Sequence, residues 1–275
     1  MKQNITENKD FYKKAILICL KLLIIFTPLA VYKYVDYFRD NQEAWLKLFV
    51  IIALTLWVIK YFNEEKRIWI KSSLNLPIIL FILIMSISLL ESKFLIVSLR
   101  DYIIFLSYFL IYFIIINNVE NEKQFFSFIT LLFITSFIIS IYTIIQYYGL
   151  DPYLRELGAL TSTIGQKNWI SNYLALIFPM IFSFFLLEKI KKNKILLFLL
   201  LSIIYTTIII CQSRGIWISI CLTLIIAIYI IVKFNIFEIF KKNKKWLTYL
   251  LLVFTIITII YSTENPLNKS LVTAP

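Results

Sequence analysis

The chain has 275 residues and a formal net charge of +12, with 60% hydrophobic and only 16% charged residues. About a quarter of the residues of a soluble globular protein are charged, so this composition excludes a water-soluble fold. The 4 glycines and 6 prolines disfavour a Gly-rich phosphate loop, and the long apolar blocks predict an all-α fold, a polytopic integral membrane helix bundle.

Nine apolar blocks follow one another, each of about the 20 residues that cross a bilayer. They span residues 15–34, 44–62, 72–90, 101–117, 125–147, 169–187, 195–211, 216–232 and 246–261. We therefore predict about nine transmembrane helices in a domain over 15–261, after a cytoplasmic tail over 1–14. Residues 262–275 are expected to begin a truncated external loop. The first block is long, contains Lys21 and Pro28 and precedes no small-residue cleavage site, so it is interpreted as a permanent span.

The seventh and eighth blocks are separated only by the segment Gln212-Ser213-Arg214-Gly215. An arginine beside a glycine is more typical of a turn than of a helix interior. We therefore predict two helices joined by a tight break rather than one continuous helix.

Basic residues are distributed unevenly between the two alternating sets of loops. The richer set comprises the N-terminal tail and residues 60–71, 117–124, 188–194 and 233–245. It contains 18 basic residues, whereas the other set contains 8, balanced by 8 acidic residues. The positive-inside rule then predicts a multi-pass protein of the cytoplasmic (inner) membrane, with the N-terminus inside and the C-terminus outside. The net charge indicates anionic membrane lipids as partners, and no nucleic acid.

Several chemistries are excluded by residues that the chain lacks. The sequence has no histidine, which removes a histidine general base, a Ser-His or Cys-His nucleophile pair and His-ligated metals. Its three cysteines form no C-x-x-C pair and lie in or beside apolar blocks. No D-x-D, Walker or Rossmann spacing occurs. We expect no cofactor and no metal, so any phosphate must be held by arginine or lysine.

The outer loop before block 169–187 is the first candidate site. Its last four residues, Gly165-Gln166-Lys167-Asn168, lead into a helix whose first turn offers free backbone N–H groups and a positive dipole end. Arg155 and Lys167 add cationic donors. These features favour an outward-facing anion site. The alternative is an ordinary helix start with lysine and tryptophan anchors at the interface.

Arginines provide two further candidates. Arg214 follows Ser213 between two apolar runs, and an arginine at membrane depth costs a few kcal/mol unless it is paired or reaches the interface. Its planar guanidinium suits bidentate binding of phosphate, although it could instead contact lipid headgroups.

Arg100 precedes Asp101 at the outer start of block 101–117. Adjacent residues do not face each other on a helix, so this is not necessarily a self-neutralising pair, although a simple interface anchor is the alternative.

Together, the two polar segments resemble the O-antigen ligase family of polytopic membrane glycosyltransferases, which includes related oligosaccharide polymerases and protein O-oligosaccharyltransferases. The resemblance rests on Thr163-Ile-Gly165-Gln-Lys-Asn168, on Asn172-Tyr-Leu-Ala-Leu-Ile-Phe-Pro179 and on Gln212-Ser-Arg214-Gly215-Ile-Trp217. The family pattern is an outer Gly-(Asn/Gln)-x-Asn, a span ending in proline, and Ser-Arg-Gly opening another span. Lys167 replaces the usual proline. The resemblance covers residues 70–260.

The resemblance implies transfer of a glycan from undecaprenyl pyrophosphate to an acceptor hydroxyl on a glycan, lipid or protein at the outer membrane face. It implies that Arg214, the predicted catalytic residue, holds the diphosphate and stabilises charge on the leaving group. Arg155 is the nearest match to a second family arginine. The predicted substrate-binding residues are Arg155, Gln166, Lys167, Asn168, Ser213 and Arg100.

The family's general base is a histidine in an external loop beyond the spans seen here, and this sequence has none. The resemblance therefore implies a chain that holds the donor but is inactive alone.

The alternative function is a transporter or flippase for a lipid-linked or anionic solute, because interrupted helices with polar residues at depth also occur in transporters. Against it, the apolar blocks carry acidic residues only at their ends, as at Asp101 and Glu188. A non-catalytic membrane scaffold is the third possibility.

Overall fold

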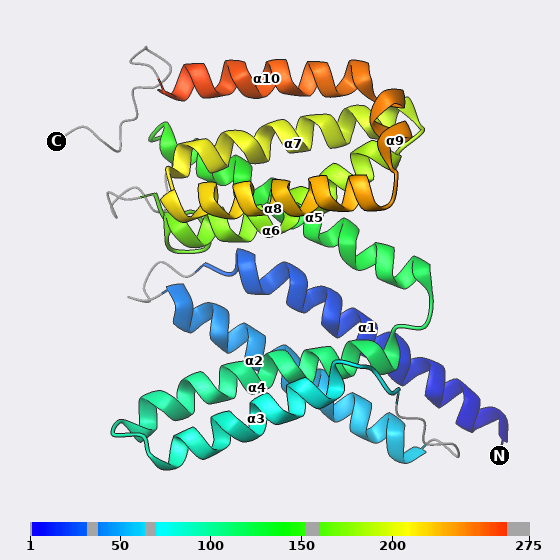
Figure 1. Cartoon of the computed structure of the whole chain (residues 1–275). Coiled ribbons are helices and arrows are strands. Elements are labelled where there is room, and N and C mark those ends of the chain that lie inside the picture. The colour runs from blue at the N-terminus through cyan, green and yellow to red at the C-terminus, as the bar shows by residue number, and fades with distance from the viewer. Residues whose placement is uncertain (1, 32–37, 64–69, 152–159, 263–275) are drawn as a thin grey trace. The chain divides into compact units, whose positions relative to one another are not determined.

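The computed structural model describes residues 2–31, 38–63, 70–151 and 160–262, which contain ten helices and no strand (Figure 1). The predicted all-α class is therefore confirmed for the described part of the chain. The helices are α1 (Lys2–Leu29), α2 (Phe38–Asn63), α3 (Asn75–Leu90), α4 (Leu95–Asn118), α5 (Glu122–Tyr147), α6 (Lys167–Leu187), α7 (Lys191–Cys211), α8 (Arg214–Lys233), α9 (Phe237–Lys242) and α10 (Lys244–Ser262).

Each predicted apolar block falls largely on one of these helices, and α9 is an additional short helix. In the described residues, six helices are long and apolar enough to cross a membrane, namely α2, α4, α5, α6, α7 and α10. The 16-residue α3 is apolar but shorter. These helices indicate a multi-pass membrane protein, while the count of nine spans stays a prediction.

The chain divides into two compact units, each with its own core. The first unit comprises Met1–Ala30 and Asp40–Leu131, and the second comprises Val31–Arg39 and Leu132–Pro275. In the first unit, α1 buries one face against α2, where Ile16 and Leu20 pack with Phe49 and Ala53. The thiol of Cys19 donates to the carbonyl of Phe49 at 3.2 Å, so this cysteine is a buried core residue.

The second unit is organised around α6, which packs against α7, α8 and α9. The residues of α6 with at most 2% of their surface exposed are Ile170, Ser171, Leu174, Ile177, Ile181 and Phe185. Apart from the adjacent pair at its start, these positions are three or four residues apart, which places them on one face of the helix. Leu201, Ile204 and Ile208 provide a similar buried row on α7.

One element boundary, and the cause of another, differ from the sequence-based expectation. The helix α1 begins at Lys2, so most of the predicted tail over 1–14 is helical. The predicted break between α7 and α8 is confirmed, but its cause is not the glycine. Gln212 adopts the left-handed conformation (φ 49°, ψ 36°) that ends α7, whereas Gly215 lies in the first turn of α8.

Candidate functional site

The loop before α6 is held by one side chain from α5. The Oε1 atom of Gln146 accepts hydrogen bonds from the backbone N–H groups of Thr161 at 2.9 Å and Ser162 at 2.7 Å. Its Nε2 atom donates to Thr161 Oγ1 at 3.0 Å. Gln146 is 3% exposed, so these bonds are shielded from competing water. This side chain therefore fixes the backbone that leads to Gly165–Asn168.

A buried carboxylate completes this network. The Oδ2 atom of Asp151, which is 1% exposed, accepts hydrogen bonds from the hydroxyl of Tyr142 at 3.0 Å and from Nε2 of Gln146 at 3.4 Å. Buried charges in proteins are normally compensated by such donors. Gly149, with φ 68°, allows the chain to turn from α5 towards Asp151.

The same loop prepares the beginning of α6. Gly165 has φ 98°, and its N–H donates to the carbonyl of Thr161 at 2.7 Å. Gln166 is extended and, in the described residues, no side chain caps the helix. The side chains of Gln166, Lys167 and Asn168 are exposed. The first turn of α6 thus presents uncapped N–H donors beside a cation, as the sequence predicted.

The end of α7 meets the beginning of α6. The hydroxyl of Ser171 donates to the carbonyl of Lys167 at 2.8 Å and also interacts with the thiol of Cys211, the last residue of α7. From Cys211 the chain passes through Gln212 and the buried Ser213 into α8. The contact of Cys211 with Ser171 places the end of α7, and with it the beginning of α8, beside the beginning of α6, so α6 and α8 begin at the same end of the second unit (Figure 1).

The predicted site residues are thus only partly brought together. Gln166, Lys167, Asn168 and Ser213 lie at this one end of the second unit, along with the backbone of Arg214. The side chain of Arg214 is not among the described parts of the chain, and Arg155 lies entirely outside the described residues. The convergence of the two arginines remains a prediction.

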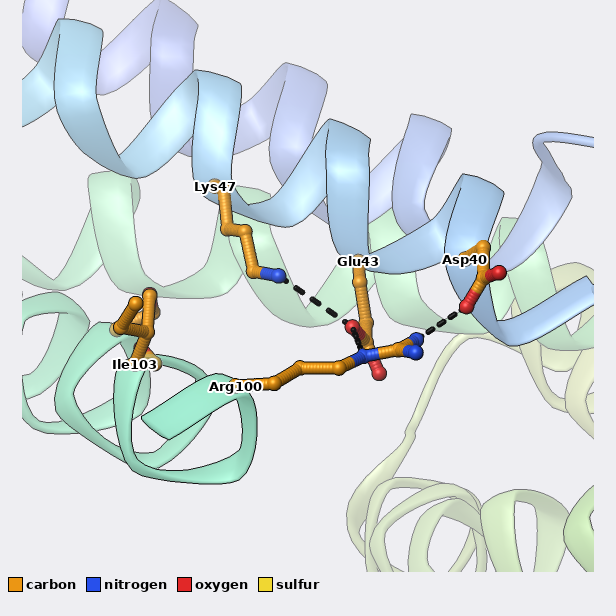
Figure 2. Close-up of polar contacts among 6 residues, drawn as sticks. Asp40, Glu43, Lys47, Arg100 and Ile103 are labelled. Carbon is orange, nitrogen blue, oxygen red and sulfur yellow. Dashed lines mark hydrogen bonds and ion pairs between the residues drawn. The ribbon is translucent and has the colours of Figure 1, made fainter. Parts of the chain in front are cut away.

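Arg100 lies in the first unit, where two carboxylates hold its guanidinium. Its Nε atom donates to Glu43 Oε2 at 3.1 Å, and its Nη2 atom forms an ion pair with Asp40. Lys47 contacts the same oxygen of Glu43 at 3.4 Å. Figure 2 shows this network, in which Arg100 on α4 points towards the two acidic residues on α2. A phosphate at Arg100 would have to compete with these carboxylates.

Glu43 was not among the predicted site residues, and it lies just before the predicted apolar block over 44–62. The structure places Glu43 on α2, and its side chain is only 8% exposed. The available signal was the spacing of Asp40, Glu43 and Lys47, because residues three or four apart share one face of a helix. The partner, Arg100, is 57 residues further along the chain from Glu43, so no local pattern identifies it.

Comparisons with protein-family models, with curated proteins and with solved structures found no match to this chain. Its function is therefore inferred from its own residues and their geometry.

Proposed function

We propose that this chain holds the diphosphate of an undecaprenyl-pyrophosphate-linked glycan while the glycan is transferred to an acceptor hydroxyl at the outer face of the cytoplasmic membrane. This is the activity implied by the resemblance to O-antigen ligases. The observation that supports it best is the common position of the first turns of α6 and α8 in the second unit. One turn begins with Lys167 and the other with Arg214.

Two adjacent helix beginnings suit a diphosphate for electrostatic reasons. Each helix has unpaired N–H groups and a partial positive charge at its first turn. Lys167 adds a point charge, and the planar guanidinium of Arg214 adds donors matched to two phosphate oxygens. Negative charge grows on the diphosphate as the sugar leaves, so these groups stabilise the transition state more than the ground state.

The network around Gln146 supports this role because it fixes the loop before the substrate arrives. Donors that are already oriented need no reorganisation during the reaction. Ser213 and Asn168, at the same end of the unit, supply neutral polar groups beside the two cations. The chain has no histidine, so in this proposal it holds the donor and the general base comes from elsewhere.

The proposed topology has about nine spans, with the N-terminus in the cytoplasm and the C-terminus outside. The 18 basic residues of the richer loop set then face the cytoplasm. The beginnings of α6 and α8 face outwards in this arrangement, where lipid-linked glycans are presented to their acceptors.

The test compares Arg214→Ala and Arg214→Lys with the unchanged chain in lipid nanodiscs, measuring the binding of undecaprenyl pyrophosphate by native mass spectrometry. Loss of a bidentate, charge-assisted contact is expected to weaken binding by about tenfold or more, and lysine is expected to restore only part of it. The matched control is Lys93→Ala, which removes an exposed cation of the outer loop set and is expected to leave binding unchanged.

Equal binding by all variants would remove Arg214 from the site and contradict the proposal.

The buried carboxylate of Glu43 favours one alternative, a transporter, because such proteins often use acidic residues within helices to couple ions. Movement of the lipid across proteoliposome membranes, unaffected by the Arg214 substitutions, would therefore support the flippase and overturn the transferase.

A further inference from the structure

A buried lysine and asparagine join two loops at the other end of the second unit. Lys194, near the start of α7, is 7% exposed, and its Nζ atom donates to Asn243 Oδ1 and, at 3.1 Å, to the carbonyl of Glu188. The Nδ2 atom of Asn243 donates to the carbonyls of Leu186 at 2.9 Å and Ile239 at 2.8 Å. The α6–α7 loop and the segment between α9 and α10 are therefore held together.

Exposed lysines surround this connection. They are Lys189, Lys191, Lys192, Lys241, Lys242, Lys244 and Lys245, which we call the lysine surface. Across the described residues, none of the seven forms an ion pair. Two acidic residues lie near these lysines in sequence. Glu238, in the first turn of α9, forms no ion pair with any of the seven in the described residues. Glu188 is engaged locally, since its Oε1 atom accepts the N–H of Ile190 at 2.8 Å. That bond lowers the pKa of the Glu188 carboxyl below its usual range.

The lysine surface is electrostatically unfavourable without a counter-charge. Lys191 and Lys192 lie in the first turn of α7, and Lys244 and Lys245 lie in the first turn of α10; neither turn contains an acidic residue. Positive side chains at these positions are opposed by the helix dipoles, and the like charges repel one another. The hydrogen bonds of Lys194 and Asn243 nevertheless keep the two groups of lysines together, so a bound anion would relieve this repulsion.

We propose that the lysine surface binds the phosphate headgroups of anionic phospholipids. Its position supports this partner, because the lysines flank the ends of α6, α7 and α10, which are long and apolar enough to cross a membrane. Lipid phosphates therefore lie at the same depth as the lysines, and clustered basic residues beside transmembrane helices attract anionic headgroups. The buried core beneath, where Phe185 and Trp246 are in edge contact, keeps the surface in place.

The experiment measures the association of spin-labelled phosphatidylglycerol, relative to spin-labelled phosphatidylcholine, with the chain in phosphatidylcholine vesicles. The triple variant Lys192→Gln, Lys242→Gln, Lys245→Gln is expected to lower this relative association by about fivefold or more at low salt. Arginine at the same three positions is expected to preserve it.

The control triple, Lys14→Gln, Lys71→Gln, Lys123→Gln, removes three exposed lysines of the first unit. Equal losses in the two glutamine triples would show a diffuse charge effect and overturn the lysine surface, as would no loss in either. A thermal unfolding scan of each variant in detergent excludes loss of folding as the cause. The proposal is independent of the glycan, so it can fail while the binding of undecaprenyl pyrophosphate is retained.

Discussion

At the scale of single residues, Gln146 illustrates how a buried amide can shape a loop. Its Oε1 atom satisfies two consecutive N–H groups, those of Thr161 and Ser162. Consecutive N–H groups converge on one acceptor only when the backbone turns sharply, and Ser162 accordingly has φ 48°. A positive φ is unfavourable for a serine, so the hydrogen bonds of Gln146 stabilise a conformation that the sequence alone disfavours.

We predict that Gln146→Leu destabilises the protein by about 2–4 kcal/mol, because it leaves two buried N–H groups without an acceptor. The measurement is thermal unfolding in detergent, together with hydrogen exchange at Thr161 and Ser162. The control is Gln124→Leu on the same helix, whose Oε1 atom accepts one exposed N–H, that of Glu120, at 3.0 Å. An unchanged melting temperature for Gln146→Leu would show that the network does not hold the loop.

The cluster around Arg100 shows a different effect at this scale. Its guanidinium forms ion pairs with Asp40 and Glu43. Lys47 contacts Glu43 as well and offsets part of its negative charge. Because Arg100 and Asp40 are about half exposed, water weakens their ion pair. Glu43 is nearly buried and depends more on its partners. Arg100 is thus better explained as the counter-charge of Glu43 than as a free phosphate ligand.

At the scale of helices, the break between α7 and α8 depends on Gln212 rather than on Gly215. A left-handed residue commonly ends a helix, and glycine is favoured there because it has no Cβ. In this chain a glutamine occupies that position, while the nearby glycine is helical. The Ser213-Arg214-Gly215 sequence therefore opens α8, and the polar residues of this segment remain at its beginning.

Two glycine substitutions should have opposite effects. A Cβ atom at Gly215 would meet nothing within 4 Å, so Gly215→Ala is expected to stabilise the protein by about 0.5–1 kcal/mol through the higher helix propensity of alanine. Gly165 has φ 98°, and Gly165→Ala is expected to destabilise it by about 1 kcal/mol or more. Melting temperatures of the two variants in one detergent provide the comparison. Destabilisation by Gly215→Ala would contradict the helical assignment of that residue.

At the scale of the whole molecule, the sequence predicts where the long helices lie, but not which buried polar side chains join them. Apolar blocks of bilayer length identify spans because the surrounding lipid imposes both length and polarity. The networks of Gln146 and Glu43 were not predictable in this way. Gln146 lies inside an apolar block, and its partners Thr161 and Ser162 follow 15 and 16 residues later. Only the folded chain shows which buried polar groups meet.

The two proposed binding regions of the second unit lie at opposite ends of one helix. Gln166–Asn168 lie at the beginning of α6, and the lysine surface begins just beyond its last residue, Leu187. The 21 residues of α6 rise about 1.5 Å each, which gives a length close to the hydrocarbon thickness of about 30 Å. An outward-facing diphosphate site and an inward-facing lysine surface are therefore compatible with a single crossing by α6.

This arrangement leads to a prediction about orientation. Single cysteines are introduced at Lys93, Gln166, Lys123 and Lys192 in a background without the three native cysteines, and cells are treated with a membrane-impermeant maleimide. Cysteines at positions 93 and 166 are expected to react in intact cells, or in spheroplasts if an outer membrane blocks the reagent. Those at 123 and 192 are expected to react only after permeabilisation, because basic loops are retained in the cytoplasm.

All four positions are exposed, so reaction after permeabilisation is the control. Labelling of position 166 only in permeabilised cells would put the beginning of α6 inside, where it could not receive a donor presented at the outer face.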